Sequence, residues 1–322
     1  MSSYKKEIGT AVQNYAGDPA NPITGQLWYD SNASEFKYQE QVTGNAWSTG
    51  NFMNTARGQL AGAGTQTAAL GFGGGSPTVT ALTESYNGTN WTEVNDLNTA
   101  RKSSGGAGTQ TAALAYGGVA PPGNFTITEL WNGSSWTEVA DLNTSTRSMG
   151  SGGTSTSAIS AGGGPVATVD TETWNGTSWT EVANLNTARN SMAGVAANNT
   201  SALAFGGHLP PGTLANTESW NGSIWTDVAD LNTARRQLAG AGIATAALAF
   251  GGETPAAAQV ANTELWNGSI WTETSDLNIV VRSNGSAGTQ TLALNFGGQD
   301  PAGFTAATEE WNAGINLGAW YT

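Results

Sequence analysis

The stretch WNGSSWTEVADLNTSTR at residues 131–147 decides the fold, because it recurs with small changes along the chain. Four related copies read YNGTNWTEVNDLNTAR, WNGTSWTEVANLNTAR, WNGSIWTDVADLNTAR and WNGSIWTETSDLNIVVR, and they begin at Tyr86, Trp174, Trp220 and Trp266. The period of roughly 42–47 residues lies in the range of β-propeller blades. A repeat of this length predicts an architecture of equivalent sheets before any single residue is considered.

One repeat contains four short runs separated by turn residues. After Arg235 these runs are RQLAGAGI, AALAFGG, NTELWNG and IWTETSDL. Their alternation predicts a four-stranded antiparallel sheet. The first run holds mainly Gly, Ala and Ser in every copy, which fits a strand that approaches the axis of a propeller. Six Gly pairs and six Thr-Glu dipeptides predict an all-β, six-bladed propeller.

Composition limits the classes of function. The chain has 322 residues with 44 Gly, but 13 Trp and the repeat argue against disorder. A net charge of −13 disfavours nucleic acid and anionic membranes as partners. There is no Cys, so disulfides and thiolate metal sites are excluded. No apolar run is long enough to insert into a membrane, and we expect no secretory signal at the start.

An Asn-Gly dipeptide separates the third and fourth runs in five repeats, which is the strongest short signal for a hairpin. The same Asn residues stand in N-x-Ser/Thr sequons, but the turn explains both residues of the dipeptide. A loop of four residues would place the two flanking aromatic rings opposite each other, whereas a loop of two would not. The sequence leaves this register open.

The fourth strand of each sheet is marked by a Trp. We expect these rings to join adjacent blades, with sugar stacking on exposed rings as the alternative. Trp47 lies ten residues before Arg57, a spacing found in other repeats, so its strand is predicted to complete the last blade and close the ring. The strand around Trp320 is the rival. The predicted fourth-strand residues are Trp47, Trp91, Trp136, Trp179, Trp225 and Trp271.

Six arginines and six glutamates recur once per repeat, which predicts a ring of Arg–Glu pairs within or between blades. Each arginine is expected to be partly buried and to hydrogen-bond Glu or loop carbonyls. The arginines are Arg57, Arg101, Arg147, Arg189, Arg235 and Arg282. The glutamates are Glu84, Glu129, Glu172, Glu218, Glu264 and Glu309.

The order of Arg, Gly-Gly, aromatic residue and Trp within each unit resembles kelch repeats over about residues 45–312. The opening IGTAVQNYAGDPANPITGQLWYDSNASEFKYQ, at residues 8–39, resembles the start of kelch-like virion proteins of marine tailed phages, especially those of cyanobacteria. This resemblance implies a structural component of a phage particle, such as a fibre, spike or decoration protein. It implies a location on the virion after synthesis in the host cytoplasm, and it brings no catalytic residues.

The chemistry of known propeller enzymes does not fit the residues present. Copper oxidases of the kelch type need several His and a Cys, whereas this chain has one His, at His208, and no Cys. Recurrent Asp residues before the Leu-Asn dipeptide predict capped turns rather than calcium sites. We therefore expect no catalytic site, no metal and no cofactor.

The loops between the second and third strands vary most and share a face, so they are candidates for a binding surface. Unconstrained drift of these loops is an equally open alternative. The candidate ligand-binding residues are Thr78, Pro121, Asn124, Asp170, His208, Pro211, Thr254, Gln259, Asp300 and Phe304.

The sequence thus predicts an attachment or assembly segment at residues 1–40 and a propeller at residues 41–322. The expected partners are other virion proteins through residues 1–40, a host-surface glycan or protein through the loops, and further copies of the chain in a homo-oligomer. A secreted, lectin-like or filament-forming cellular propeller is the alternative.

Overall fold

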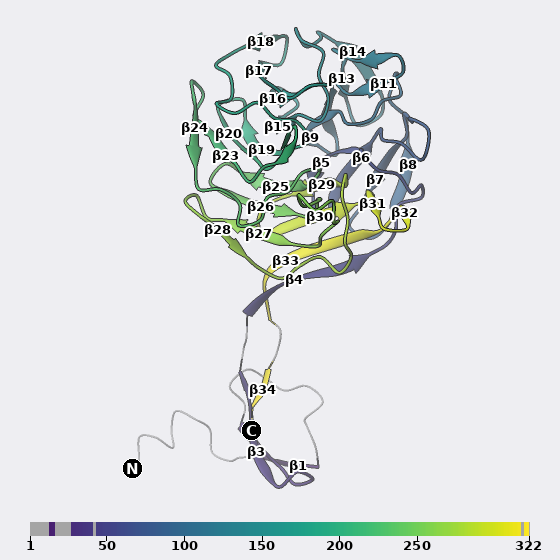
Figure 1. Cartoon of the computed structure of the whole chain (residues 1–322). Coiled ribbons are helices and arrows are strands. Elements are labelled where there is room, and N and C mark those ends of the chain that lie inside the picture. Colours follow the sequence, from purple (N-terminus) through teal and green to yellow (C-terminus); the bar gives the residue numbers. More distant parts are fainter. Residues whose placement is uncertain (1–12, 17–26, 41–42, 317–318, 322) are drawn as a thin grey trace. The chain divides into compact units, whose positions relative to one another are not determined.

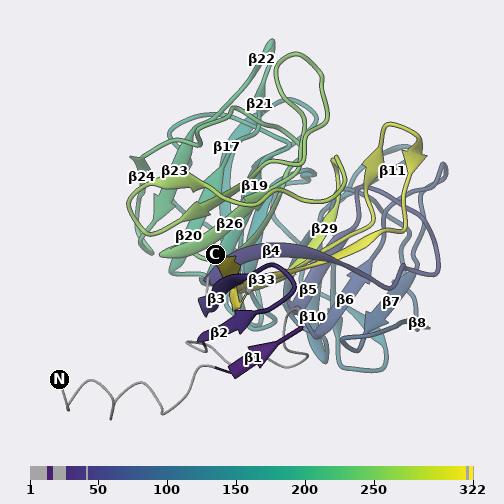
Figure 2. The ribbon, with the colours of Figure 1, turned by 90° about the horizontal axis from the view of Figure 1, so that it is seen from below.

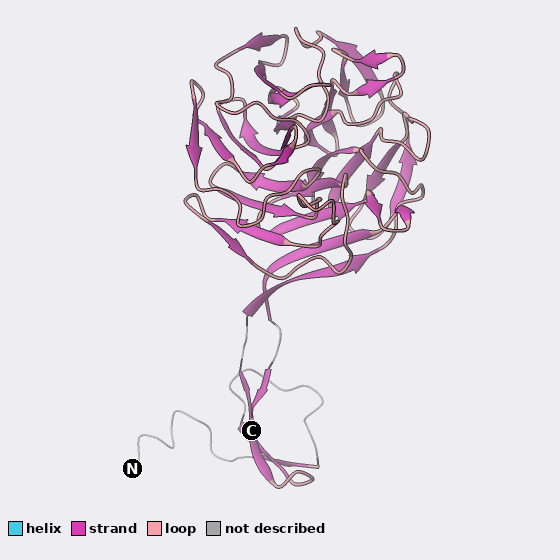
Figure 3. Ribbon diagram, viewed as in Figure 1, coloured by secondary structure: helices cyan, strands magenta, loops and turns pink. Residues whose placement is uncertain are grey.

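The computed structural model describes residues 13–16, 27–40, 43–316 and 319–321. These residues form strands, turns and loops, and none of them is helical (Figure 3). Accordingly, the part of the chain that is described holds no helix with the length and apolarity needed to cross a membrane. Contacts divide the chain into a terminal unit, Met1–Asn45 with Ala313–Thr322, and a body, Ala46–Asn312.

The terminal unit joins strands from both ends of the sequence. Its sheet runs in the order β1 (Gln13–Tyr15), β2 (Leu27–Asp30), β3 (Glu35–Glu40) and β34 (Ala319–Tyr321). Strand β1 is parallel to β2, and the other pairs are antiparallel. This grouping differs from the expected boundary, which left residues 313–322 in the propeller, because β34 pairs with β3.

The body contains six four-stranded antiparallel sheets, numbered here from first to sixth in chain order of their first strands. The first three are β5 (Ala61–Thr65), β6 (Ala68–Phe72), β7 (Thr83–Tyr86), β8 (Trp91–Val94); β9 (Gly105–Thr109), β10 (Ala112–Tyr116), β13 (Thr128–Trp131), β14 (Trp136–Val139); and β15 (Gly150–Thr154), β16 (Ser157–Gly163), β17 (Thr168–Trp174), β18 (Trp179–Glu181). The last three are β19 (Ala193–Asn198), β20 (Ser201–Phe205), β23 (Thr217–Trp220), β24 (Trp225–Val228); β25 (Ala239–Ile243), β26 (Ala246–Phe250), β27 (Thr263–Trp266), β28 (Trp271–Glu273); and β29 (Gly285–Gly288), β30 (Leu292–Phe296), β33 (Thr308–Asn316), β4 (Thr43–Gly50).

The sixth sheet combines strands from distant parts of the sequence. Its fourth strand is β4, which carries Trp47, whereas Trp320 lies in β34 of the terminal sheet. Asn45 Oδ1 accepts a hydrogen bond from Gly314 N at 3.0 Å, and Ser48 Oγ donates to Glu310 O at 3.3 Å. The start of β4 therefore lies beside the end of β33.

The arrangement of the sheets is propeller-like. Figure 1 shows the first strands gathered near the centre of the body and the fourth strands at its periphery. First strands approach one another so closely that a Cβ added to Gly62 would lie 2.2 Å from Ser286 O of the sixth sheet. Only a residue without a side chain fits such an approach, which accounts for the small residues of the first strands.

The core lies between the faces of neighbouring sheets. Leu70 and Phe72 of the first sheet are fully buried against Ala113, Ala115 and Trp136 of the second. The rings of Phe72 and Trp136 lie 5.0 Å apart. The fourth-strand Trp rings are thus buried packing elements.

The structure settles the register of the hairpin between the third and fourth strands. Trp131 pairs directly with Trp136, and their rings are 5.3 Å apart. The loop between them, residues 132–135, has four residues. Asn132 Oδ1 accepts from Ser134 N and Ser135 N, both at 2.9 Å, and Gly133 has a φ of 93°.

Three short hairpins interrupt the connections between second and third strands in alternate sheets. They are β11 (Val119–Ala120) with β12 (Gly123–Asn124), β21 (His208–Leu209) with β22 (Gly212–Thr213), and β31 (Gln299–Asp300) with β32 (Gly303–Phe304). They belong to the second, fourth and sixth sheets. Figure 2 shows the β21–β22 hairpin projecting from the body at the top of the view.

Candidate functional site

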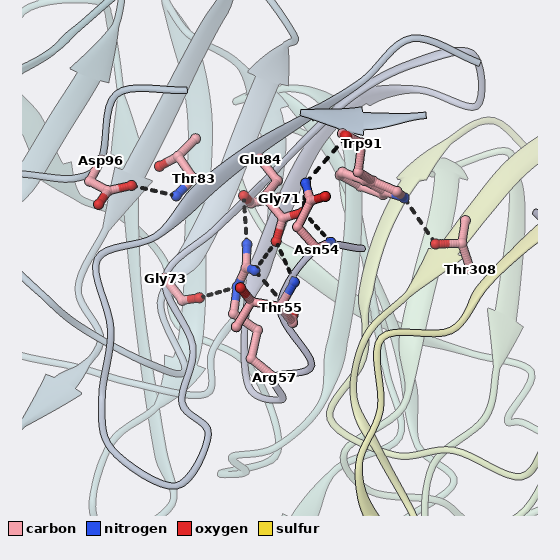
Figure 4. Close-up of polar contacts among 10 residues, drawn as sticks. All are labelled: Asn54, Thr55, Arg57, Gly71, Gly73, Thr83, Glu84, Trp91, Asp96 and Thr308. Carbon is pink, nitrogen blue, oxygen red and sulfur yellow. Dashed lines mark hydrogen bonds and ion pairs between the residues drawn. The ribbon is translucent and has the colours of Figure 1, made fainter. Parts of the chain in front are cut away.

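A buried ion pair lies inside the first sheet and shows how the repeat residues work. Arg57 has no exposed surface and forms an ion pair with Glu84 through Nη1 (Figure 4). Its Nε donates to Gly73 O at 3.0 Å, and its Nη2 donates to Gly71 O at 3.3 Å. Asn54 directly follows Met53, which stands at the repeat-leucine position, and it donates to Glu84 Oε2 from its backbone N at 2.7 Å and its Nδ2 at 3.0 Å. These contacts hold the segment of residues 54–57 against the third strand, β7.

Equivalent pairs form in three other sheets. They join Arg101 to Glu129, Arg189 to Glu218 at 3.1 Å, and Arg235 to Glu264 at 2.8 Å. All six side chains are buried. Burial lowers the pKa of Arg101, Arg189 and Arg235, and the facing glutamates act in the opposite direction. A buried guanidinium tolerates this environment because each is paired and hydrogen-bonded.

The expectation of six equivalent pairs needs correction at two sheets. Arg147 and Arg282 stand one residue later than the other four arginines. Thr146 and Val281 occupy the buried position instead, and Thr146 Oγ1 donates to Gly162 O at 3.2 Å. Arg147 and Arg282 are half-buried, and Arg282 pairs with Glu253 rather than with Glu309. The extra residue between the repeat leucine and each arginine (LNTSTR and LNIVVR) was the visible signal.

Glu309 is consequently a buried carboxylate whose arginine has been replaced by Val281. It accepts hydrogen bonds from Asn278 N at 2.7 Å, Asn278 Nδ2 at 2.6 Å and Ile279 N at 3.3 Å. Burial outweighs these bonds and raises the pKa of Glu309.

Each third-strand glutamate pairs with a residue on the second strand, and the type of this residue depends on whether the buried arginine is present. Where the arginine is present it is small: Gly71, Ala115, Ala204 and Ala249. Where the arginine is replaced it is Ser160 or Asn295, which pair with Glu172 and Glu309. Larger polar side chains therefore occupy the two sheets that lack a buried guanidinium.

Each fourth-strand Trp reaches the sheet before its own. Trp136 Nε1 donates to Thr83 Oγ1 at 3.2 Å, and Trp91 Nε1 donates to Thr308 Oγ1 at 3.0 Å. The latter bond joins the first sheet to the sixth. The remaining four Trp–Thr bonds are 3.0–3.2 Å long: Trp179 to Thr128, Trp225 to Thr171, Trp271 to Thr217 and Trp47 to Thr263.

Sequence reasoning missed two of these structural residues, although both recur in all six repeats. The Asn of the LNT triplet, which reads MNT in the first copy and LNI in the last, binds the glutamate of the following sheet. The Thr of the Thr-Glu dipeptide receives the Trp. Recurrence within the chain was the signal that marked them.

The repeated Asp residues cap strands. Asp96 Oδ1 accepts from Thr83 N at 2.9 Å, and Asp276 Oδ1 accepts from Thr263 N at 2.9 Å. Asn184 replaces Asp in the third sheet and makes the same bond to Thr171 N at 3.1 Å. Within the described ranges, no group of three or more His, Asp or Glu side chains is arranged to hold a metal ion.

The ten candidate loop residues are distributed around one side of the body. Asn124, His208, Asp300 and Phe304 lie in the three short hairpins, and Pro121 and Pro211 lie in their turns. Thr78, Thr254 and Gln259 lie in the loops of the first and fifth sheets, but Asp170 is part of β17 rather than of a loop. No hydrogen bond or ion pair among the described residues joins two of these ten side chains. One of them, His208, has its Nδ1 3.5 Å from Arg236 Nη1.

A cyclic set of backbone hydrogen bonds circles the centre of the body. Each bond runs from the N–H of one sheet's residue to the carbonyl of the corresponding residue of the preceding sheet, over 2.7–2.8 Å. The six residues all have φ between 53° and 58°, within the left-handed region. The donor–acceptor pairs are Gln59 to Ser283, Ser103 to Gln59, Ser148 to Ser103, Ser191 to Ser148, Gln237 to Ser191 and Ser283 to Gln237.

These six residues and the first strands line an axial cavity of about 230 Å³. Its walls carry Ser and Gln side chains among small apolar residues and backbone. Immediately before the cyclic residues stand Lys102, Arg147, Arg236 and Arg282, with Asn190 and Gly58 at the equivalent places. Cationic residues therefore directly precede four of the six cavity-lining residues of the cycle.

Comparison with known proteins adds no relative. No protein-family model matches this chain, and neither does any curated protein sequence.

Proposed function

We propose that the body is a closed, six-bladed, kelch-like β-propeller. The cyclic hydrogen bonds through Gln59, Ser103, Ser148, Ser191, Gln237 and Ser283 support closure, because they return to their starting residue after six sheets. The six Trp–Thr bonds support the same count. In this proposal β4 is the strand that completes the last blade, and it does so with a segment from the start of the chain.

We further propose that the protein is a non-enzymatic structural component of a phage virion that presents this propeller to a ligand. The observation that carries the proposal is the contrast between a uniform scaffold and one variable side. The scaffold repeats the Trp–Thr bond in all six sheets and the buried Arg–Glu pair in four of them, whereas the hairpins and loops between second and third strands differ from sheet to sheet. The resemblance of residues 8–39 to phage virion proteins supplies the particle as the setting.

The arrangement of the only His of the sequence also favours binding over catalysis. His208 lies in β21 next to the positively charged Arg236, with a 3.5 Å separation. A neighbouring guanidinium supplies no acceptor to orient the imidazole, so this pair lacks the carboxylate partner that a catalytic His uses. The secreted, lectin-like propeller remains the second candidate, since a variable ligand-facing side would serve it equally.

Quantitative mass spectrometry of purified particles tests the proposal. Particles from the phage that encodes this chain should contain it in a fixed, multiple copy number that survives density-gradient purification. Recovery only in the particle-free culture medium would contradict the virion role and favour the secreted propeller. Recovery at variable, substoichiometric amounts would contradict a structural role.

A further inference from the structure

Two arginines that directly precede cavity-lining residues already hold a carboxylate supplied by the chain. Arg236 of the fifth sheet and Arg282 of the sixth both form ion pairs with Glu253. Glu253 is only 2% exposed, and it directly follows the Gly pair of the fifth sheet. Burial acts to raise the pKa of Glu253, but the hydrogen bonds and charges of the two arginines outweigh it and lower the pKa. This group of three residues is called the filled clamp below.

The second and third sheets repeat the same positions without the carboxylate. Lys102 stands where Arg236 stands, and Arg147 stands where Arg282 stands. Val119 occupies the place of Glu253: Lys102 forms a backbone bridge with Val119 as Arg236 does with Glu253. Among the described residues, no ion pair engages the side chain of Lys102 or Arg147.

Backbone contacts show that these two cations are neighbours in the same way as the filled pair. The residues that follow them, Ser103 and Ser148, are joined by an N–H to carbonyl bond of 2.8 Å. The bond between Gln237 and Ser283, which follow Arg236 and Arg282, is also 2.8 Å long. The two pairs therefore sit on equivalent parts of one backbone cycle.

We propose that Lys102 and Arg147 form an open clamp that binds the carboxylate of an external ligand at the rim of the axial cavity. The ligand's carboxylate takes the position that Glu253 fills in the fifth sheet. Val119 leaves this position without a charge of its own, and both cations are half-buried, so they are reachable from solvent.

The distribution of charge strengthens this assignment. The body has eight Lys and Arg residues, and four of them are consumed by buried pairs with third-strand glutamates. The filled clamp uses two more. Lys102 and Arg147 are thus the cations that remain for an anion, in a chain whose net charge is −13. A selective anion site in an acidic protein requires such a local concentration of positive charge.

The surroundings of the open clamp favour a carboxylated sugar. Ser103 and Ser148 line the cavity directly beside the two cations, and their hydroxyl groups can both donate and accept hydrogen bonds. A sugar acid offers one carboxylate for the cations and several hydroxyls for these serines. This assignment deepens the proposed ligand-presenting role, and it rests on that role only for its biological meaning.

Titration calorimetry of the full-length protein with glucuronate tests the clamp, with glucose and acetate as comparison ligands. Glucuronate should bind saturably at one site, glucose should not bind detectably, and acetate should bind more weakly because it lacks hydroxyls. Arg147→Gln should weaken glucuronate binding by about tenfold or more, because it removes a charge-assisted hydrogen bond.

Two substitutions exchange the states of the clamps and serve as matched controls. Val119→Glu supplies an internal carboxylate between Lys102 and Arg147, so it should abolish glucuronate binding and raise the thermal midpoint. Glu253→Val gives the fifth sheet the residue type found at Val119 and so empties the filled clamp; it should lower the thermal midpoint and add a second glucuronate site. Arg282→Gln should leave binding at the open clamp unchanged.

Several results would overturn the proposal. Absence of saturable glucuronate binding, or equal affinity in wild type, Arg147→Gln and Val119→Glu, would refute the open clamp. Equal affinity for acetate and glucuronate would refute the sugar assignment. Because these measurements use the isolated protein, their failure is distinct from failure to find the chain in virions.

Discussion

Trp91 and Thr308 are 217 residues apart in the sequence, yet Trp91 Nε1 donates a 3.0 Å hydrogen bond to Thr308 Oγ1. Trp91 ends up in the first sheet and Thr308 in the sixth, so the bond crosses the seam between the earliest and latest repeats. Both groups are buried, and the other five Trp–Thr bonds cross the remaining sheet boundaries in the same geometry. The contact between the first and sixth sheets therefore uses the same bond as the five contacts between consecutive sheets.

Removing the hydroxyl at this seam should destabilise the body modestly. Thr308→Val leaves the Trp91 N–H buried without its acceptor, which costs about 1–3 kcal/mol. Urea unfolding followed by Trp fluorescence measures the change in the free energy of unfolding. Thr128→Val, which removes the acceptor of Trp179 at an internal boundary, is the matched control and should have a similar effect. A far smaller effect at Thr308 would argue against an equivalent seam.

Removing the glutamate charge should be far more damaging where an arginine is buried. Glu129→Gln leaves the guanidinium of Arg101 buried without its counter-ion, so we expect a loss of about 3–5 kcal/mol. Glu172→Gln is the control, because Thr146 replaces the arginine in that sheet. Its loss should be clearly smaller in the same urea experiment. Equal losses would mean that the Arg101–Glu129 pair has no special role.

The protonated form of Glu309 should make the body more stable at acid pH than it is at neutral pH, where this buried carboxylate is charged. Its pKa in the folded protein is raised above the ordinary value of 4.5. The folded state therefore binds this proton more tightly than the unfolded state, so its contribution is full below pH 4.5 and is lost as pH rises through the folded pKa. Glu309→Gln should flatten this part of the pH dependence of unfolding, measured from pH 4 to 8.

Placing an arginine opposite Glu309 should remove the destabilisation that its buried charge causes at neutral pH. The double substitution Val281→Arg with Asn295→Ala recreates the combination found in four other sheets, a buried arginine and a small second-strand residue. We expect a gain in the free energy of unfolding at pH 7 that shrinks as pH falls and Glu309 becomes protonated. The single substitution Val281→Arg, with Asn295 still in place, should fail to give the gain because the space is filled. A gain that is independent of pH would contradict an effect through Glu309.

Two truncations should separate the terminal unit from the body. Deletion of residues 1–42 preserves all of β4 and should leave the thermal midpoint of the body nearly unchanged. Deletion of residues 1–50 removes Trp47 and the whole fourth strand of the sixth sheet, so it should lower the midpoint severely. Differential scanning calorimetry compares the two. Similar unfolding of both variants would assign a stabilising role to the residues before β4.

The repeat in the sequence was enough to predict four-stranded antiparallel sheets, since turn residues and alternation recur at fixed places. It was not enough to align every copy. Residue type matched Arg147 and Arg282 to Arg101. The structure matches them to Lys102 instead, because they lie one residue farther from the repeat leucine than Arg101 does. The register of the Trp hairpin was also beyond the sequence, since either loop length fits an Asn-Gly turn.

The candidate binding side was only partly predictable. Loop variability and Pro content marked the connections that carry the three short hairpins. The clamps could not be predicted from the sequence, because Glu253 and Val119 lie in variable segments that do not align. The structure shows that they are equivalent, since each forms a backbone bridge with the residue that follows a buried arginine. The pairing of β34 with β3 likewise depends on contacts between chain ends that no local pattern encodes.

The side-by-side placement of the start of β4 and the end of β33 has a mechanical consequence. Both chain ends leave the body from adjacent points of one sheet, so tension applied through them pulls the two strands in the same direction. The hydrogen bonds between β4 and β33 then carry little load, and the pull falls on the pairing of β33 with β30 as shear along the strands. A body anchored through its ends in this way would resist detachment by force better than one held by a single peripheral strand.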